Sequence, residues 1–363
     1  TDFGKSLLNF SNEEVMGEDA EKWLAFQVAT TYGLDKETWD VRQAWVLENS
    51  WLINRVARFP MDIHNWEEAD EPWQFLAACE EYYAVVTKRL RQHTRLPIAT
   101  DATCSGLQIL AALARDRKTA QLVNVLPSDK PQDAYKVVAD TAKPHIPEYL
   151  HNIWDRSRVK RTVMTIPYNA KPFSNRSYIR DALKEGGIEI DKDDLTITVR
   201  AVRDAMTTVV PGCLAVMKWI EDEVAKAIKR DVKELIWTTP SGFVVVQRLM
   251  KRKMETIELK LLGRCQMRVA TDETGEVDRS RHKAATAPNL IHSLDSSLLH
   301  LSVEKFDNPI ALIHDSVLCR ATDMTELSTI VRSVYMYLFA ENDYLTDFAN
   351  QIGAKSKPPI IGD

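Results

Sequence analysis

Strand-forming segments in this chain are few and short, and two of them end at an aspartate. Residues 96–100 are an apolar run that ends at Asp101, and residues 310–313 are another that leads into a turn containing Asp315. The return run at 316–319 predicts that the second segment is one arm of a tight hairpin. If the two strands pair, both carboxylates emerge at the same end of one sheet.

Most of the remaining chain carries helical periodicity. Apolar residues recur at three- and four-residue spacing, which is typical of amphipathic helices. Such helices are predicted at 37–58, 72–93, 195–210 and 212–230, the last two separated by Pro211-Gly212. Residues 235–270 alternate Val, Ile, Thr and Leu with basic residues, which indicates a β-rich insertion. We therefore predict a helix-rich α+β protein around a small sheet.

The composition excludes several classes of protein. The 363 residues are 45% apolar and include nine Trp, which excludes intrinsic disorder. No stretch approaches the roughly 18 consecutive apolar residues of a membrane-spanning helix, so we expect no membrane partner. The net charge of −5 means that a polyanion must be bound by a local positive patch. Five scattered cysteines without a C-x-x-C pair indicate a reducing compartment.

The two aspartates are candidate metal ligands. Carboxylates gathered at one end of a sheet suit Mg²⁺, which prefers one or two carboxylates together with substrate phosphates. Two such ions about 4 Å apart activate an attacking oxygen and neutralise a leaving one. The alternative is that Asp101 and Asp315 are ordinary turn residues, which is the commoner case for such a pattern.

A basic run at 156–180 holds seven Lys or Arg side chains and no acid. Within it Arg156 and Lys160 are four residues apart, so on a helix both cations lie on one face. Their natural ligand is a polyphosphate, because Arg binds phosphate as a bidentate fork and Lys as a point charge. A solvated helix face is the alternative. Pro167 precedes Tyr168, and we expect the helix to end or kink there, since Pro cannot donate a backbone hydrogen bond.

At four places the chain resembles the phage and mitochondrial single-subunit DNA-dependent RNA polymerases. These segments, in the family's order, are Asp101-Ala102-Thr103-Cys104-Ser105-Gly106-Leu107-Gln108 (motif A), Arg156-x3-Lys160-Arg161-x2-Met164-Thr165-x2-Tyr168 (motif B), Ala287-Pro288-Asn289-x2-His292-Ser293, and Ile313-His314-Asp315-Ser316 (motif C). The resemblance implies a helix-rich right-hand polymerase fold, with a small antiparallel palm sheet and helical fingers. It also implies template-directed nucleotidyl transfer, namely DNA-dependent RNA synthesis.

The resemblance assigns the reaction to particular residues. It implies that Asp101 and Asp315 hold two Mg²⁺ ions, with Ala102 offering its backbone carbonyl, and that chemistry follows a two-metal mechanism. Arg156 and Lys160 match the cations that grip the triphosphate of a ribonucleoside triphosphate. Lys160 is also expected to protonate the leaving group.

Other residues are assigned to the nucleotide in the same way. Tyr168 matches a tyrosine that packs at the nucleotide site and helps to select ribose over deoxyribose. His292 matches a histidine that contacts the nascent base pair, with a capped helix histidine as the alternative. Lys36 lies at a family position near the nucleotide phosphates, although its neighbour Asp35 also suits a helix cap.

The β-rich segment resembles a DNA-reading element of the same family. Its residues 250–268 match the hairpin that reads promoter bases in the major groove. Arg suits guanine edges and Glu suits the cytosine amino group. The expected base-reading residues are Thr256, Glu258, Gln266 and Arg268. A plain basic ribbon that holds phosphates is the alternative.

The resemblance also predicts the division of the chain. Residues 1–117 form the first part of the palm, with a helical insertion at about 15–92, and residues 293–363 form its second part. Residues 118–292 form the fingers, including a β-hairpin at about 243–270. No segment resembles the N-terminal promoter-melting domain or the thumb. We therefore expect a portion of a larger polymerase, whose remaining domains lie in the parent chain or a second chain.

The expected partners are a DNA template, nascent RNA and ribonucleoside triphosphates. The expected location is the cytoplasm of a phage-infected cell, with the mitochondrial matrix as the alternative. Two other functions remain open: a family A type DNA polymerase, whose motif B shares the Arg, Lys and Tyr spacing, and a non-catalytic nucleic-acid-binding fragment. One departure from the family is Asn169, where Gly is usual, and Asn tolerates the left-handed conformation better than most residues.

Overall fold

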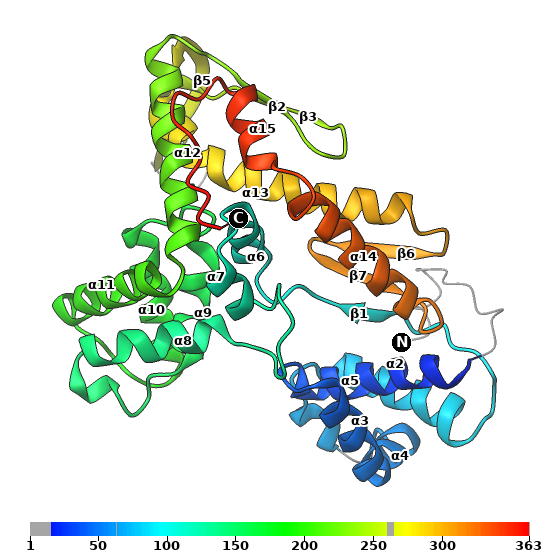
Figure 1. The fold of residues 1–363 in the computed structure, drawn as a ribbon. Helices are drawn as coiled ribbons and strands as arrows, with labels where there is room; N and C mark the ends of the chain where they lie inside the picture. Colours follow the sequence, from blue (N-terminus) through cyan, green and yellow to red (C-terminus); the bar gives the residue numbers. More distant parts are fainter. Residues whose placement is uncertain (1–15, 63, 260–264, 363) are drawn as a thin grey trace. The chain divides into compact units, whose positions relative to one another are not determined.

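The computed structural model describes residues 16–62, 64–259 and 265–362. The chain forms two compact units (Figure 1). The first unit contains residues 1–105, 126–132 and 298–338, and the second contains residues 106–125, 133–297 and 339–363. The elements are mostly helices with small antiparallel sheets, which confirms the predicted α+β class.

A three-stranded antiparallel sheet lies in the first unit. Its strands are β1 (Ile98–Thr100), β6 (Ile310–Ile313) and β7 (Ser316–Cys319), in the order β1-β7-β6. Thr100 lies opposite Val317 in the β1–β7 pair, and Ile313 lies opposite Ser316 in the β6–β7 pair. The predicted tight hairpin is confirmed, since two residues alone connect its strands.

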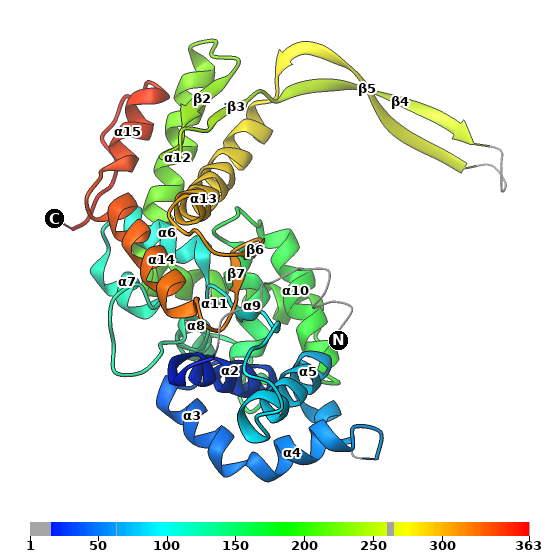
Figure 2. The same cartoon turned by 90° about the vertical axis from the view of Figure 1, so that its right-hand side faces the viewer.

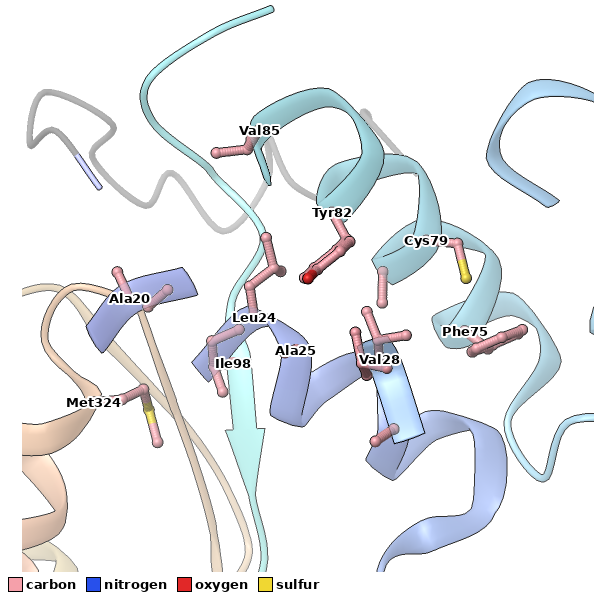
Figure 3. Packing of buried hydrophobic residues seen from close by; sticks show 14 of the residues in the cluster. Ala20, Leu24, Ala25, Val28, Phe75, Cys79, Tyr82, Val85, Ile98 and Met324 are labelled. Atoms are coloured by element: carbon pink, nitrogen blue, oxygen red, sulfur yellow. The ribbon is translucent and has the colours of Figure 1, made fainter. Parts of the chain in front are cut away.

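The helices of the first unit share one hydrophobic core with this sheet. They are α2 (Glu18–Ala29), α3 (Trp39–Glu48), α4 (Ser50–Arg58), α5 (Pro72–Tyr82) and α14 (Met324–Phe339), with the short turns η1 (Thr30–Leu34), η2 (His64–Glu68) and η3 (Tyr83–Thr87). Figure 3 shows Ile98 of β1 among Leu24 of α2, Tyr82 of α5 and Met324 of α14. Leu24 and Ile98 are fully buried. Burying such a side chain contributes about 1.5–3 kcal/mol, so this core fixes β1.

The helices of this unit are shorter than predicted. The segment predicted as one helix at 37–58 is divided at Asn49, whose side-chain amide donates to the Trp45 carbonyl at 2.9 Å and so competes with the helical backbone. The helix predicted at 72–93 ends at Thr87. Thr38 caps α3 by accepting from the backbone of Val41. Asp35 is the C-cap of η1, so the helix-cap position expected for it is confirmed.

The second unit is mainly helical. Its helices are α6 (Ser105–Leu113), α7 (Arg117–Leu122), α8 (Ala134–Ala142), η4 (Lys143–His145), η5 (Glu148–Leu150), α9 (Arg156–Thr165), α10 (Pro172–Glu185), α11 (Lys192–Val209), α12 (Pro211–Lys229), α13 (Arg279–Glu304) and α15 (Tyr344–Gln351), the last residues of α13 belonging to the first unit. Helix α9 ends two residues before Pro167, as predicted. The break at Pro211 is also confirmed, because α12 begins there with Pro in its first turn.

Two antiparallel strand pairs complete the second unit. Strand β2 (Leu235–Thr238) pairs with β3 (Val244–Gln247), and β4 (Met250–Leu259) pairs with β5 (Cys265–Val277) in a long ribbon (Figure 2). The ribbon differs from the hairpin predicted at about 243–270. Residues 244–247 belong to the other pair, because the side chain of Gln247 is buried against α13 and donates to Thr286 at 2.9 Å.

The segment after α15 is tied to α12 by one buried carboxylate. Glu223 accepts from the Lys355 backbone N–H at 2.6 Å, from the Ser356 hydroxyl at 2.5 Å and from Lys226 at 2.6 Å. Burial alone raises the pKa of Glu223, but these donors outweigh it and lower the pKa from 4.5 to about 2. The charged carboxylate therefore holds this segment in place.

Among the described residues, no helix is both long enough and apolar enough to cross a bilayer.

We predict that Glu223→Gln lowers the free energy of unfolding by about 2 kcal/mol at neutral pH, because it weakens three hydrogen bonds to a buried charge. The lowered pKa means that this contribution is present above pH 4.5 and is lost as the pH falls toward 2. Urea unfolding at several pH values measures the difference. Asp222→Asn, in an exposed pair with Lys218 on the same helix, is the control. A difference that stays constant on acidification would contradict this role.

Candidate functional site

The sheet of the first unit brings Asp101 and Asp315 to the same end. Asp101 follows β1 directly, and its carboxylate accepts a hydrogen bond from the Ser316 hydroxyl at the start of β7. Asp315 occupies the adjoining β6–β7 turn, where His314 Nδ1 lies 3.0 Å from its Oδ1 atom. His314 takes φ 58°, a left-handed conformation that few residues other than Gly adopt. The predicted juxtaposition of the two aspartates is therefore present.

The surroundings of Asp101 alter the pKa of its carboxyl group. Partial burial raises the pKa of Asp101, and the neighbouring Asp315 raises it further through its charge and its hydrogen bonding. The Ser316 hydroxyl and the backbone N–H of Ala102 act in the opposite direction, but the pKa stays above its ordinary value. Two adjacent carboxylates with mutual repulsion fit a divalent cation, which would relieve that repulsion through oxygen ligands.

Arg156 and Lys160 lie on α9 in the second unit. They are one turn apart on the same face of the helix, whose first turn is capped by Asp155. Arg156 Nε forms an ion pair with Asp133 Oδ2 at 2.7 Å, while Lys160 is exposed. Asp133 was not predicted from the sequence. The sequence around Asp133 indicates only a helix N-cap. Asp133 does cap α8, since its side chain accepts from the Lys136 N–H at 3.1 Å.

Tyr168 and His292 are brought together in the second unit. Their ring centroids are 4.8 Å apart, with an angle of 40° between the rings. Tyr168 follows the end of α9, and His292 lies in the interior of α13. A Cβ atom at Gly106 would lie 3.0 Å from the Tyr168 hydroxyl and 3.1 Å from Pro167 Cβ. Gly at position 106 therefore gives the Tyr168 ring its space against α6.

The turn that carries Tyr168 is completed by Asn169. Asn169 adopts φ 64°, which confirms that the position keeps the left-handed conformation expected of the usual Gly. Its side-chain amide donates to Glu221 Oε1 at 3.0 Å and to the Ala284 carbonyl at 2.9 Å. The sequence pattern gave no sign of these two partners.

The remaining predicted residues are Lys36 and the four base-reading residues of the β4–β5 ribbon. Lys36 pairs with the side chain of Asp35 in the first unit, and its role toward nucleotide phosphates stays a prediction. On the β4–β5 ribbon Thr256 lies opposite Arg268, and Glu258 lies opposite Gln266. Residues that oppose each other directly, or lie two apart, share a face of a ribbon. The four predicted base-reading side chains are therefore exposed on one face.

Comparison with known proteins gives a consistent family. A sequence profile described as DNA-dependent RNA polymerase matches residues 14–360. The DNA-directed RNA polymerase of Enterobacteria phage T3 is 29% identical over 96% of this chain and 46% of its own length. The chloroplastic DNA-directed RNA polymerase 3 of Nicotiana sylvestris is 30% identical over 99% of this chain and 40% of its own length.

A mitochondrial relative agrees with these two. The DNA-directed RNA polymerase of Schizosaccharomyces pombe mitochondria is 28% identical over 94% of this chain and 32% of its own length. The chain thus spans less than half the length of each of these relatives.

We predict that Asp315→Asn lowers the pKa of the Asp101 carboxyl, because it removes the neighbouring negative charge. Ser316→Ala is expected to raise the same pKa, because it removes a donor that stabilises the charged form. Carboxyl ¹³C shifts of the Asp-labelled chain, followed through the acidic range, measure both changes. Equal Asp101 midpoints in all three proteins would contradict the described pairing.

Proposed function

The chain belongs to the DNA-dependent RNA polymerase family, and on this premise we propose that it carries catalytic residues for RNA synthesis on a DNA template. The observation that supports this most is the pairing of β1 with β7, which brings Asp101 beside Asp315. The oxygen donors and their shared negative charge suit divalent cations. The reaction would join the RNA 3′-oxygen to the α-phosphorus of a ribonucleoside triphosphate and release pyrophosphate.

The metal-binding role rests on three residues. When bound, two Mg²⁺ ions held by Asp101, Asp315 and the Ala102 carbonyl would supply the positive charge that activates the attacking hydroxyl and stabilises pyrophosphate. Ser316 has a supporting part, because its hydroxyl donates to Asp101 and favours the charged carboxylate. His314 contacts Asp315 within the turn and so helps to orient it.

The cations of α9 would bind the triphosphate. Arg156 is oriented by its ion pair with Asp133, and its guanidinium carbon lies 5.6 Å from the centroid of the Tyr135 ring. The guanidinium group of Arg156 would therefore be oriented by Asp133 and Tyr135 before a phosphate binds. Lys160 is exposed one turn further along and would donate a proton to the oxygen that leaves with pyrophosphate.

Tyr168 and His292 would contact the sugar and base of the nucleotide. Their rings are in contact, and the Tyr168 hydroxyl lies against the start of α6 at Gly106. A tyrosine hydroxyl in a fixed position can favour a substrate that forms a hydrogen bond with it. Ribose can form this bond through its 2′-hydroxyl, and deoxyribose cannot. Lys36 is proposed as a further contact to the nucleotide phosphates.

The β4–β5 ribbon would contact the DNA. Its face with Thr256, Glu258, Gln266 and Arg268 presents both donors and acceptors, which suits the edges of bases in the major groove. We propose the palm for residues 1–117 and 293–363 and the fingers for residues 118–292. The other polymerase domains would come from the parent chain or a second chain, in a phage-infected cell or in mitochondria.

Two alternatives lead to different results in one assay. A family A type DNA polymerase would extend a primer with deoxynucleoside triphosphates, whereas the proposed function requires ribonucleoside triphosphates. A non-catalytic fragment would bind nucleic acid and extend nothing. Primer extension on a DNA template, with each kind of nucleotide in turn, distinguishes the three. Exclusive use of deoxynucleotides would overturn the proposed function.

We predict that Asp315→Ala abolishes nucleotide addition and leaves template binding nearly intact, because binding comes mainly from phosphate contacts. Extension of a primed template and fluorescence anisotropy of the same template measure the two properties. Asp307→Ala, at an exposed aspartate ahead of β6, is the matched control and should keep both. Retention of as much as about a tenth of the wild-type rate by Asp315→Ala would contradict a metal-binding role, since such a role is worth several kcal/mol.

A further inference from the structure

Helix α13 contains a proline, and one carbonyl group of the helix therefore lacks its usual backbone hydrogen-bond donor. Pro288 lies inside the helix and has no N–H group to donate to the carbonyl four residues earlier, that of Ala284. In this chain that carbonyl accepts a hydrogen bond from the Asn169 side-chain amide at 2.9 Å. Pro288 thus leaves the Ala284 carbonyl as a free acceptor in the helix, and the side chain of Asn169 donates to it.

The side-chain amide of Asn169 forms further hydrogen bonds with Glu221 and Lys171. Asn169 Nδ2 also donates to Glu221 Oε1 of α12 at 3.0 Å, and Lys171 donates to Asn169 Oδ1. Glu221 is held in turn by Lys171 at 3.3 Å and by Lys283 of α13 at 3.6 Å. Two acceptors face the amide nitrogen and an ammonium group faces its oxygen, so these partners set the orientation of the amide.

A glycine could not make this connection. Gly adopts φ 64° without strain, whereas Asn at this φ has a conformational cost that its hydrogen bonds offset. Gly would also leave the turn freer in both the folded and the unfolded state. The substitution of Asn for the usual Gly therefore replaces a flexible turn by one that is bonded to α12 and α13.

These bonds act next to the proposed nucleotide site. Tyr168 is the neighbour of Asn169 in the chain, and its ring contacts His292, which lies on the same helix as Ala284. The turn is therefore attached to α13 at two places, by the amide of Asn169 and by the ring of Tyr168. We propose that Asn169 is a positioning residue that fixes the Tyr168 ring against His292 and thereby sets nucleotide affinity and ribose selection. This role rests on the proposed function.

The substitution Asn169→Asp tests the bonds without changing the size of the side chain. Asp tolerates the same φ, but a carboxylate oxygen replaces the donor and faces two acceptors, one of them charged. We expect the KM for ribonucleoside triphosphates to rise about tenfold and the ribo/deoxy preference to fall about tenfold, with kcat changed less. Single-nucleotide extension at varied nucleotide concentration measures all three.

A second substitution supplies the rescue. Glu221→Gln alone should stay close to wild type, because the amide oxygen of Gln still accepts from Asn169. Combined with Asn169→Asp it should restore most of the lost affinity and preference, because the Gln amide can donate to the new carboxylate. Tyr168→Phe gives the reference for loss of the tyrosine hydroxyl, and Asp222→Asn on α12 is the control for a charge change beside Glu221.

The outcomes separate this role from the proposed function. An active wild type whose KM and ribo/deoxy preference are unchanged by Asn169→Asp would overturn the positioning role alone, even if thermal stability fell. Loss of both properties without rescue by Glu221→Gln would also overturn it, because the effect would not pass through the described bonds. A wild type that adds neither kind of nucleotide would overturn the proposed function and this role together.

Discussion

The antiparallel pairing of β1 with β7 joins groups that the chain keeps far apart. Asp101 and Ser316 are 215 positions apart and are hydrogen-bonded, with Asp315 in the adjoining turn. Closing so long a loop is unfavourable. Placing two carboxylates together is unfavourable as well, and the pKa of Asp101 is raised by its partial burial and by the charge of Asp315. Burial of Ile98 and its core neighbours offsets these terms. The proposed chemistry depends on this pairing, because a one-residue slip would turn Asp101 to the other face.

In the second unit, the side chains proposed to bind the nucleotide gather where the helical backbone is interrupted by proline. Pro167 follows the end of α9, and the chain turns there to present Tyr168. Pro288 leaves α13 with an unsatisfied carbonyl, to which Asn169 is bonded. Each proline removes a backbone hydrogen-bond donor, and at Pro288 the Asn169 side chain supplies the missing bond. The same residues thus determine both the local fold and the geometry that nucleotide binding would use.

Features with a local cause could be predicted from the sequence, and so could the meeting of Asp101 with Asp315, because each aspartate follows a recognisable strand. Other contacts between distant residues could not be predicted. The end of α9 before Pro167 and the start of α12 at Pro211 follow from the chemistry of proline. The ion pair of Arg156 with Asp133 and the bond of Asn169 to Glu221 join distant segments, and neither partner carries a local signal. The strand content near residue 250 was foreseeable, but strand pairing is decided by tertiary burial, and the hairpin bounds therefore differed.

We propose that the end of the β1–β7 pair is a divalent-cation site shared by Asp101 and Asp315. Mn²⁺ tests it directly, because this paramagnetic ion broadens the NMR signals of nearby amides. With ¹⁵N-labelled Thr and Val, we expect the signals of Thr100 and Val317, which oppose each other, to broaden together. In Asp101→Asn both signals should stay sharp at the same Mn²⁺ concentration. Broadening of only one of the two signals, or equal broadening in the variant, would contradict the account.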